Sequence, residues 1–171
     1  MVKSRIFLKQ FSDVYQVRRL TKDDVPCILR LCKTNPYYYQ HCPPNPTLES
    51  IRQDMKALPP KTTKKDKRYV GFFKGKELVA VLDLILNYPN SDTCFIGFFM
   101  MHKKHQGQGI GSRIIQHVLE YIKKSYKAVR LGYVTTNKQA KGFWLKNGFK
   151  HTGQEYQQPQ YLVKIMAKEL K

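Results

Sequence analysis

Acidic residues are scarce in this sequence of 171 residues. Twelve Asp and Glu compare with 31 Lys and Arg, which gives a formal net charge of +19 at pH 7. Such a balance favours anionic partners, namely nucleic acid, an acidic membrane surface or a phosphorylated small molecule. However, 23 of the cations are lysines spread along the whole chain. A lysine-rich composition without functional meaning therefore stays open as the alternative.

Long apolar runs and cysteine motifs are also missing. No run approaches the roughly 18 apolar residues that a membrane-spanning helix requires, so we expect no membrane association. The apolar residues at the N-terminus are interrupted by Lys3, Arg5 and Lys9, unlike those of a signal peptide, and we expect a cytoplasmic protein. The four cysteines show neither CxxC spacing nor a histidine partner pattern. We therefore expect reduced thiols and no metal site.

The length and composition are those of one domain. With 42% hydrophobic residues the chain can form a sizeable core, and it contains no internal repeat and no separating linker. We expect a single domain over residues 1–171, as a monomer or a homodimer.

Apolar periodicity predicts a mixture of strands and helices. Helices are expected from Thr21, as N-cap, to about Lys33, and over 47–58, 110–122 and 137–147. Strands are expected at 14–20, 69–73, 78–86, 93–101 and 128–134, with a final pair near the C-terminus. The strand at 93–101 is apolar enough to be buried on both faces. Residues 35–46 are expected to form a loop, and 61–68 a solvated, mobile basic stretch.

A glycine-rich turn, Gln-Gly-Gln-Gly-Ile-Gly at 106–111, separates the strand at 93–101 from the following helix. Unpaired backbone N–H groups and the positive dipole end make a helix start an anion site. Glycines allow the backbone to approach phosphate oxygens and to adopt positive φ. With Lys103, Lys104 and Arg113 nearby, the turn predicts a phosphate ligand. The alternative is a turn that only links a strand to a helix.

Two common phosphate-binding patterns do not fit this turn. A Walker A loop requires Gly-Lys-Ser/Thr, but Gly111 is followed by Ser112 and Arg113. A dinucleotide fingerprint requires glycine at 112 and an acidic residue about 20 positions later, and both are missing.

A third pattern, Gln/Arg-x-x-Gly-x-Gly/Ala, matches residues 106–111 at every defined position. Downstream, residues 137–149 match Asn-x-x-Ala-x-x-x-Tyr-x-x-x-Gly-Phe except at Trp144. In this order the two motifs resemble the GNAT family of N-acetyltransferases, in particular its small bacterial-type members. The order of elements from Tyr15 to Leu170 is also similar to that family, so the resemblance covers nearly the whole chain.

The resemblance implies an α/β fold, with a mixed, mostly antiparallel central sheet of about six to seven strands flanked by about four helices. It implies acetyl-CoA as cosubstrate and direct transfer of the acetyl group to a primary amine in a ternary complex. The backbone of Met101 would polarise the thioester carbonyl, and Asn137 would contact the pantetheine arm. The implied cofactor-binding residues are Met101, Gln106, Gly107, Gln108, Gly109, Ile110, Gly111, Ser112, Asn137 and Trp144.

The sequence departs from the family at the proton-transfer groups. Trp144 occupies the position where many members carry a tyrosine that protonates the leaving thiolate, and an indole N–H is no proton source near neutral pH. Tyr133 is the candidate substitute, with a packed strand tyrosine as the alternative. Asp83, inside an apolar strand, is the candidate general base, with a solvent-facing strand residue as the alternative. The acceptor itself stays unassigned.

Tyr37, Tyr38 and Tyr39 lie where the family places its acceptor-binding loop, and an aromatic wall suits an amine held by cation–π contact. Tyrosines that only cover a small core are the alternative. The rival function is a non-catalytic or nucleic-acid-binding basic module that retains a CoA-type fold. No nucleic-acid-binding signature supports that rival, so we expect no nucleic-acid partner.

Overall fold

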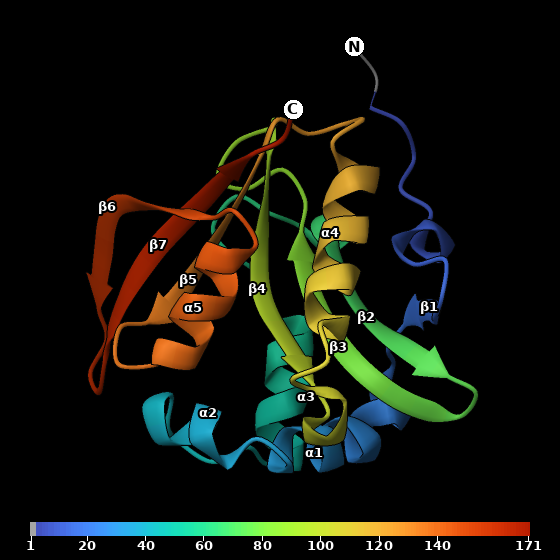
Figure 1. The fold of residues 1–171 in the computed structure, drawn as a ribbon, viewed down its shortest axis with the longest axis vertical. Helices are drawn as coiled ribbons and strands as arrows, with labels where there is room; N and C mark the ends of the chain where they lie inside the picture. The colour runs from blue at the N-terminus through green and yellow to red at the C-terminus, as the bar shows by residue number, and fades with distance from the viewer. Residues whose placement is uncertain (1–2) are drawn as a thin grey trace.

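The computed structural model describes residues 3–171, which form one sheet of seven strands in the order β1-β2-β3-β4-β5-β7-β6 (Figure 1). All neighbouring strands are antiparallel except β4 and β5. The expected mixed, mostly antiparallel sheet is thus confirmed. The strands are β1 (Gln16–Arg19), β2 (Lys67–Lys74), β3 (Glu77–Ile85), β4 (Thr93–Met101), β5 (Ala128–Val134), β6 (Lys150–Gln157) and β7 (Leu162–Glu169).

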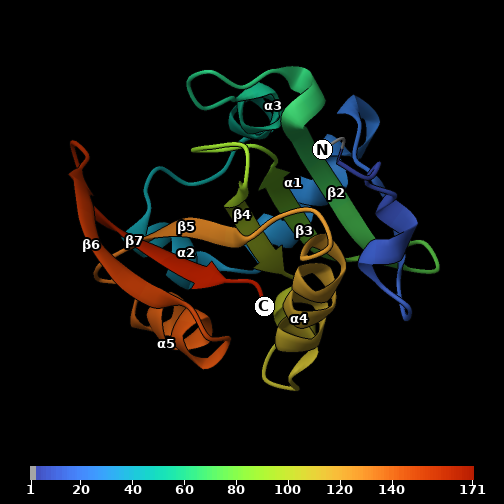
Figure 2. The same cartoon turned by 90° about the horizontal axis from the view of Figure 1, so that it is seen from above.

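Five α-helices accompany the sheet within residues 3–171: α1 (Val25–Lys33), α2 (Pro36–His41), α3 (Leu48–Lys56), α4 (Ile110–Ile122) and α5 (Lys138–Lys146). Figure 2 shows α4 and α5 on one side of the sheet and α3 on the other. None of the helices in this part of the chain has the length and apolarity needed to cross a membrane.

Each face of the sheet has its own apolar core. The α4 face buries a stripe at helical spacing, including Ile114, Ile115 and Val118, against β3, β4 and β5. The opposite face packs α1, through residues such as Ile28 and Leu31, against β2 and β3. Each fully buried side chain of this size contributes roughly 1.5–3 kcal/mol relative to exposure. Because successive side chains of a strand point to opposite sides of the sheet, a strand residue contributes to one core or to the other.

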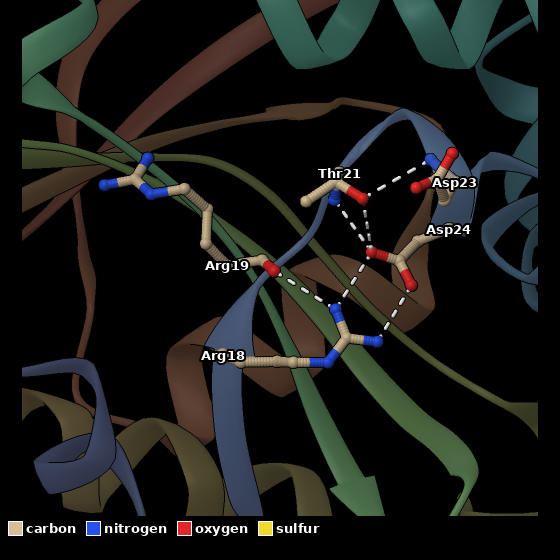
Figure 3. Close-up of polar contacts among 5 residues, drawn as sticks. All are labelled: Arg18, Arg19, Thr21, Asp23 and Asp24. Carbon is tan, nitrogen blue, oxygen red and sulfur yellow. Dashed lines mark hydrogen bonds and ion pairs between the residues drawn. The ribbon is translucent and has the colours of Figure 1, made fainter.

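The junction between β1 and α1 is fixed by a capping box and an ion pair (Figure 3). The Thr21 hydroxyl accepts a hydrogen bond from the Asp23 N–H at 3.3 Å, and the Asp24 carboxylate accepts one from the Thr21 N–H at 2.7 Å. Arg18 donates two hydrogen bonds to Asp24 and lowers the pKa of that carboxyl. Thr21 is thus the predicted N-cap, although the first turn is a 3-10 turn that precedes α1.

Two segments differ from the expectation. The tyrosine run is not loop but forms α2, which begins at Pro36, a residue whose fixed φ suits a first helical turn. The basic stretch 61–68 is not irregular throughout, since it contains a 3-10 turn and the start of β2. Lys67 is buried because its ammonium group pairs with Asp83 of β3. A local reading of the sequence shows the charge of Lys67 but not its distant partner.

The prediction that β4 is buried on both faces is wrong for its middle. Gly97 is exposed, and Phe95, Phe98 and Phe99 are half-buried. The reason is that β5 pairs with β4 only from Thr93 to Ile96, after which the two strands separate, as Figure 1 shows. A register shift in the β3–β4 pairing lies at the same place.

Candidate active site

A cavity of about 930 Å³ opens where β4 and β5 separate. At one end, here called the turn end, it is lined by the glycine-rich turn and by α5. At the other, the hairpin end, it is lined by α2, the β3–β4 loop, the start of β5 and the β6–β7 hairpin. The turn-end residues used below are Gly107, Gly109, Gly111, Ser112, Asn137 and Trp144, and the hairpin-end residues are Tyr38, Tyr88, Phe95, Arg130, Tyr156 and Tyr161.

The backbone of Met101 faces this cavity because of its register in the sheet. Met101 lies opposite Ala80, and the His102 N–H donates to the Val79 carbonyl at 2.9 Å. Met101 is therefore in a non-hydrogen-bonded pair, and its own N–H and C=O point away from β3. No strand of the described chain pairs with β4 on that side beyond Ile96. The Met101 N–H is thus available to a ligand, which the role of an oxyanion-type donor requires.

Phe99 has the same backbone orientation, since it lies two residues before Met101 on the same strand. Its N–H also points toward the separation of β4 and β5. Sequence reasoning did not select Phe99, although the period of two along a strand would have found it once Met101 was chosen. Together the two residues direct two parallel N–H groups into the cavity.

Gln106 organises the turn instead of pointing at a ligand. Its side-chain amide donates to the Met101 carbonyl at 2.9 Å and to the Asn35 side-chain oxygen at 2.6 Å. Asn35 in turn donates to the same Met101 carbonyl at 2.9 Å. The end of β4, the turn and the residue that precedes α2 are therefore held together, and the Met101 carbonyl is occupied by protein donors.

The three glycines of the turn are required for two different reasons. Gly107 and Gly109 have φ of +81° and +75°, which non-glycine residues adopt only with strain, and both face open space. Gly111 has ordinary helical geometry, but a Cβ there would lie 2.8 Å from the Met101 sulfur and 3.3 Å from the Phe143 ring. The first two set the backbone path, and the third allows α4 to approach β4 and α5.

The start of α4 presents backbone donors to the turn end. Gly109 is the N-cap and has no side chain to satisfy them, and the first internal hydrogen bond of the helix runs from Arg113 to Gly109 at 3.1 Å. The N–H groups before Arg113 therefore have no partner within the helix. Among the predicted cofactor residues, Gln108 and Ile110 do not line the cavity: the Gln108 amide bonds to the Lys104 carbonyl, and the Ile110 side chain packs on the core.

The segment 137–149 covers the turn end. Asn137 is buried and caps α5, since its side-chain oxygen accepts the Ala140 N–H at 2.9 Å. Trp144 lines the cavity and contacts Phe99 and Phe143 edge-on, with ring centroids 6.2 and 4.8 Å apart. The indole is therefore held as an apolar wall beside the end of β4.

A further residue, Asn147, joins α4 to α5 and was missed by sequence reasoning. It is buried, donates to the Ser112 hydroxyl at 3.1 Å, and accepts from the Gln116 amide at 3.0 Å. These bonds fix the hydroxyl of Ser112 at the edge of the cavity.

Tyr133 lines the cavity, but its hydroxyl is directed elsewhere. The oxygen lies 2.6 Å from Nε2 of His151 on β6. In the sheet, β6 lies two positions beyond β5, on the side away from β4. Burial also raises the pKa of Tyr133. The geometry therefore does not support Tyr133 as a proton donor at the separation of β4 and β5.

Asp83 forms a buried ion pair instead of an open catalytic group. Its carboxylate lies 2.9 Å from the Lys67 ammonium nitrogen, which also donates to the Ala57 carbonyl at 2.8 Å. Asp83 is not among the residues that line the cavity. Burial raises its pKa to about 6, an effect that Lys67 opposes. The geometry supports neither the general-base role nor the solvent-facing alternative.

The tyrosine run separates into three environments. Tyr38 lines the cavity and contacts Phe98 edge-on at 6.0 Å. Tyr37 is exposed and contacts His41, and Tyr39 packs against the core beneath α1. The structure therefore brings one of the three predicted acceptor-binding tyrosines to the site.

The charge of the lining is one-sided. Within residues 3–171, the cavity is lined by the cations Arg130 and Lys146 and by no Asp or Glu. The hairpin end adds three tyrosines, Tyr88, Tyr156 and Tyr161, that sequence reasoning did not select. They come from separate segments, and no local motif connects them. Residues 3–171 contain no group of acidic, histidine or cysteine side chains suited to a metal ion.

The sequence matches a known protein-family model. A family described as Acetyltransferase (GNAT) family matches residues 30–149, a span that contains β4, the turn, α4 and α5. No curated protein matches the sequence at a significant level.

Solved structures of similar fold cover nearly the whole chain. An acetyltransferase from Thermus thermophilus is 22% identical, with a TM-score of 0.73 over 90% of this chain and 96% of that one. An acetyltransferase from Salmonella typhimurium, described as modifying the N-terminal serine of ribosomal protein L7/L12, is 18% identical, with a TM-score of 0.74 over 94% and 98%. The ribosomal-protein-S18-alanine N-acetyltransferase of Escherichia coli is 13% identical, with a TM-score of 0.65 over 91% and 93%.

Proposed function

The chain belongs to the acetyltransferase (GNAT) family, and on this premise we propose that it transfers an acetyl group from acetyl-CoA to a primary amine by direct attack in a ternary complex. The observation that carries the proposal is the pair of backbone N–H groups of Phe99 and Met101, which face the cavity beside the glycine-rich turn. Backbone donors fixed in this way stabilise the negative charge that develops on a carbonyl oxygen during acyl transfer.

The turn end fits the cosubstrate in chemistry and in shape. Open space at Gly107 and Gly109 and the unpartnered N–H groups at the start of α4 suit a pyrophosphate. Acetyl-CoA, when bound, supplies an acetyl group activated as a thioester. Asn137 and Ser112 offer polar groups to the pantetheine arm, and Trp144 supplies an apolar wall.

Met101 performs the central electrostatic task in this proposal. Its N–H donates to the carbonyl oxygen of the acetyl group, and its position is fixed by the two amides that occupy its own carbonyl. Phe99 offers the preceding N–H to the pantetheine arm. The acceptor amine approaches from the hairpin end, on the opposite face of the sheet from α4.

Proton transfer in this site does not use a carboxylate of the lining. The cavity lining holds two cations and no carboxylate, which disfavours a charged ammonium group, so the acceptor reacts as the neutral amine and its surplus proton leaves to water. A thiol with an ordinary pKa of about 8.5 departs readily as thiolate. Neither step requires an acid at Trp144.

Release of free thiol from acetyl-CoA, followed against a panel of primary amines, tests this function. Acetylation of at least one amine, at a rate that depends on amine concentration, is the expected result. CoA binding with no thiol release for any amine would favour the non-catalytic module. Because the solved ribosomal-protein N-acetyltransferases share the fold, peptide N-termini belong in the panel beside small amines.

A further inference from the structure

We propose that the acceptor carries a carboxylate at some distance from its reacting amine, and that Arg130 binds this carboxylate. The inference deepens the proposed N-acetyltransferase function and rests on it. Arg130 belongs to β5, half-buried, and its side chain lines the hairpin end of the cavity. Its neighbours Val129 and Leu131 are buried in the α4-side core, so alternation directs Arg130 to the opposite, acceptor-facing side of the sheet.

Most N–H donors of the Arg130 guanidinium group have no side-chain partner among residues 3–171. Its only side-chain hydrogen-bond partner among residues 3–171 is the neutral amide oxygen of Gln154 on β6. No carboxylate of the described chain forms an ion pair with Arg130. A guanidinium carries five N–H donors in a fork that matches a carboxylate. A half-buried cation held by one neutral amide is therefore ready to bind an anionic group.

Arg130 also has no competitor at the hairpin end. The other cation of the lining, Lys146, comes from α5 on the opposite face of the sheet. No acidic side chain lines the cavity within residues 3–171, so nothing repels an incoming carboxylate. Tyr38, Phe95 and Tyr156 provide apolar walls for the body of the acceptor.

The sheet register sets the spacing between amine and carboxylate. Arg130 pairs with Phe95, whereas the thioester would lie at Phe99 and Met101. Because β4 carries an extra residue at the register shift, Phe95 and Phe99 lie opposite Ile85 and Leu82, which are three residues apart on β3. This corresponds to roughly 10 Å at about 3.3 Å per residue. An amino acid acetylated at its α-amine is too short for this span. A peptide N-terminus with an acidic side chain in its first few residues fits, and so does a long amino acid that reacts at its terminal side-chain amine.

Matched acceptors that differ only in the carboxylate test the proposal. The peptides Ala-Phe-Glu-amide and Ala-Phe-Gln-amide have the same reacting amine, and free lysine and lysine amide form the corresponding small-molecule pair. We expect the wild-type enzyme to prefer the carboxylate-bearing member of at least one pair by at least tenfold in kcat/KM. The pair that shows the preference identifies the source of the carboxylate.

Arg130→Gln should remove this preference, so that the ratio of kcat/KM between the carboxylate-bearing acceptor and its neutral counterpart falls to about one. Arg130→Lys should restore part of the preference. Arg52→Gln, which removes an exposed arginine on α3 away from the cavity, is the matched control and should keep the preference. Unchanged thermal unfolding of Arg130→Gln would show that the variant is folded.

Two results would overturn the inference. One is equal kcat/KM for both members of both pairs in the wild type, and the other is a preference that survives in Arg130→Gln. Either would leave the N-acetyltransferase function standing. A failure of the function itself gives a different result, namely no thiol release with any of the four acceptors or with the wider amine panel.

Discussion

The turn end and the hairpin end of the cavity differ in the groups that face the ligand, which are backbone N–H groups at the first and side chains at the second. The turn end uses backbone N–H groups of β4 and α4, all within one continuous stretch of the chain. The hairpin end uses side chains from α2, the β3–β4 loop, β5 and the β6–β7 hairpin. Recognition through peptide groups requires glycines and a fixed path, so it leaves a spacing pattern in the sequence. Recognition through side chains leaves no such pattern and is free to change between relatives.

The largest effect on cosubstrate binding is expected at the turn end, from Gly109→Val. A β-branched residue at φ of +75° is strained, and relief of the strain would misdirect the N–H groups at the start of α4. Loss of one hydrogen bond to a charged group costs about 1.5–3 kcal/mol, or roughly 10- to 150-fold in CoA affinity. Calorimetric titration with CoA measures this change.

Gly75→Val is the matched control for that variant. Gly75 also has positive φ, +59°, and open space around it, but it lies in the β2–β3 turn away from the cavity. Both variants should lose similar stability, and only Gly109→Val should lose CoA affinity. Unchanged CoA binding by a folded Gly109→Val protein would show that the turn end does not recognise the cosubstrate through its backbone.

Lys67→Met tests whether the buried ion pair belongs to the fold or to the site. Removal of one partner leaves the Asp83 carboxylate buried and uncompensated, which costs about 3–5 kcal/mol of unfolding free energy near neutral pH. In the wild type, burial raises the pKa of Asp83 to about 6, so the native state binds the proton more tightly than the unfolded state. The contribution of Asp83 to stability therefore falls as pH rises from about 4 to 6.

Without Lys67 the pKa of Asp83 should rise further. The pH range over which ionisation of Asp83 lowers the stability of the protein should then extend to higher pH. Acidification to about pH 5 should thus recover much of the stability that Lys67→Met loses, as measured by denaturant unfolding at both pH values. In the companion variant Asp83→Asn, kcat and its pH dependence should stay within a few-fold of wild type. A hundredfold loss of kcat in a stable Asp83→Asn protein would instead restore Asp83 as the general base.

Trp144→Phe, also at the turn end, should have a smaller effect. Phenylalanine keeps an aromatic wall against Phe99 and Phe143 but fills less space, so a stability loss of about 1 kcal/mol is expected. If the thiolate leaves without an acid, kcat should stay within a few-fold of wild type, and Trp144→Tyr should equal or exceed it. Steady-state kinetics at saturating acetyl-CoA measure both. A loss of several orders of magnitude in kcat with CoA binding intact would make the indole essential.

The same contrast explains what the sequence could predict. The sheet, the main helices and the turn followed from local periodicity and from glycines whose φ or close packing demands them. The role of the Met101 N–H was predicted from the family resemblance. The β3–β4 register gives the physical reason that this N–H points away from β3. Asp83 was selected as a carboxylate inside an apolar strand, and Tyr133 as a phenol on the strand before the segment that contains Trp144. Their actual partners, Lys67 and His151, lie 16 and 18 residues away. Only the sheet register brings them together, so local reasoning assigned them a catalytic role that the geometry does not support.

The smallest effect is expected for nucleic-acid binding. Such binding would require anion recognition by surfaces outside the turn end. The lysines are dispersed over helices, turns and the C-terminal strand instead of forming one stripe, and several already pair with acids, as Lys104 does with Glu77 at 2.7 Å. Binding to generic RNA or duplex DNA should therefore be weak at about 150 mM salt. A surface that neutralises several phosphates would instead give a steep salt dependence, with a log–log slope of about −0.9 per phosphate on duplex DNA. Fluorescence anisotropy titrations over a range of salt concentrations measure both quantities. Nanomolar affinity near physiological salt would contradict this expectation, and competition by free CoA would then show whether the nucleic acid occupies the turn end or a separate surface.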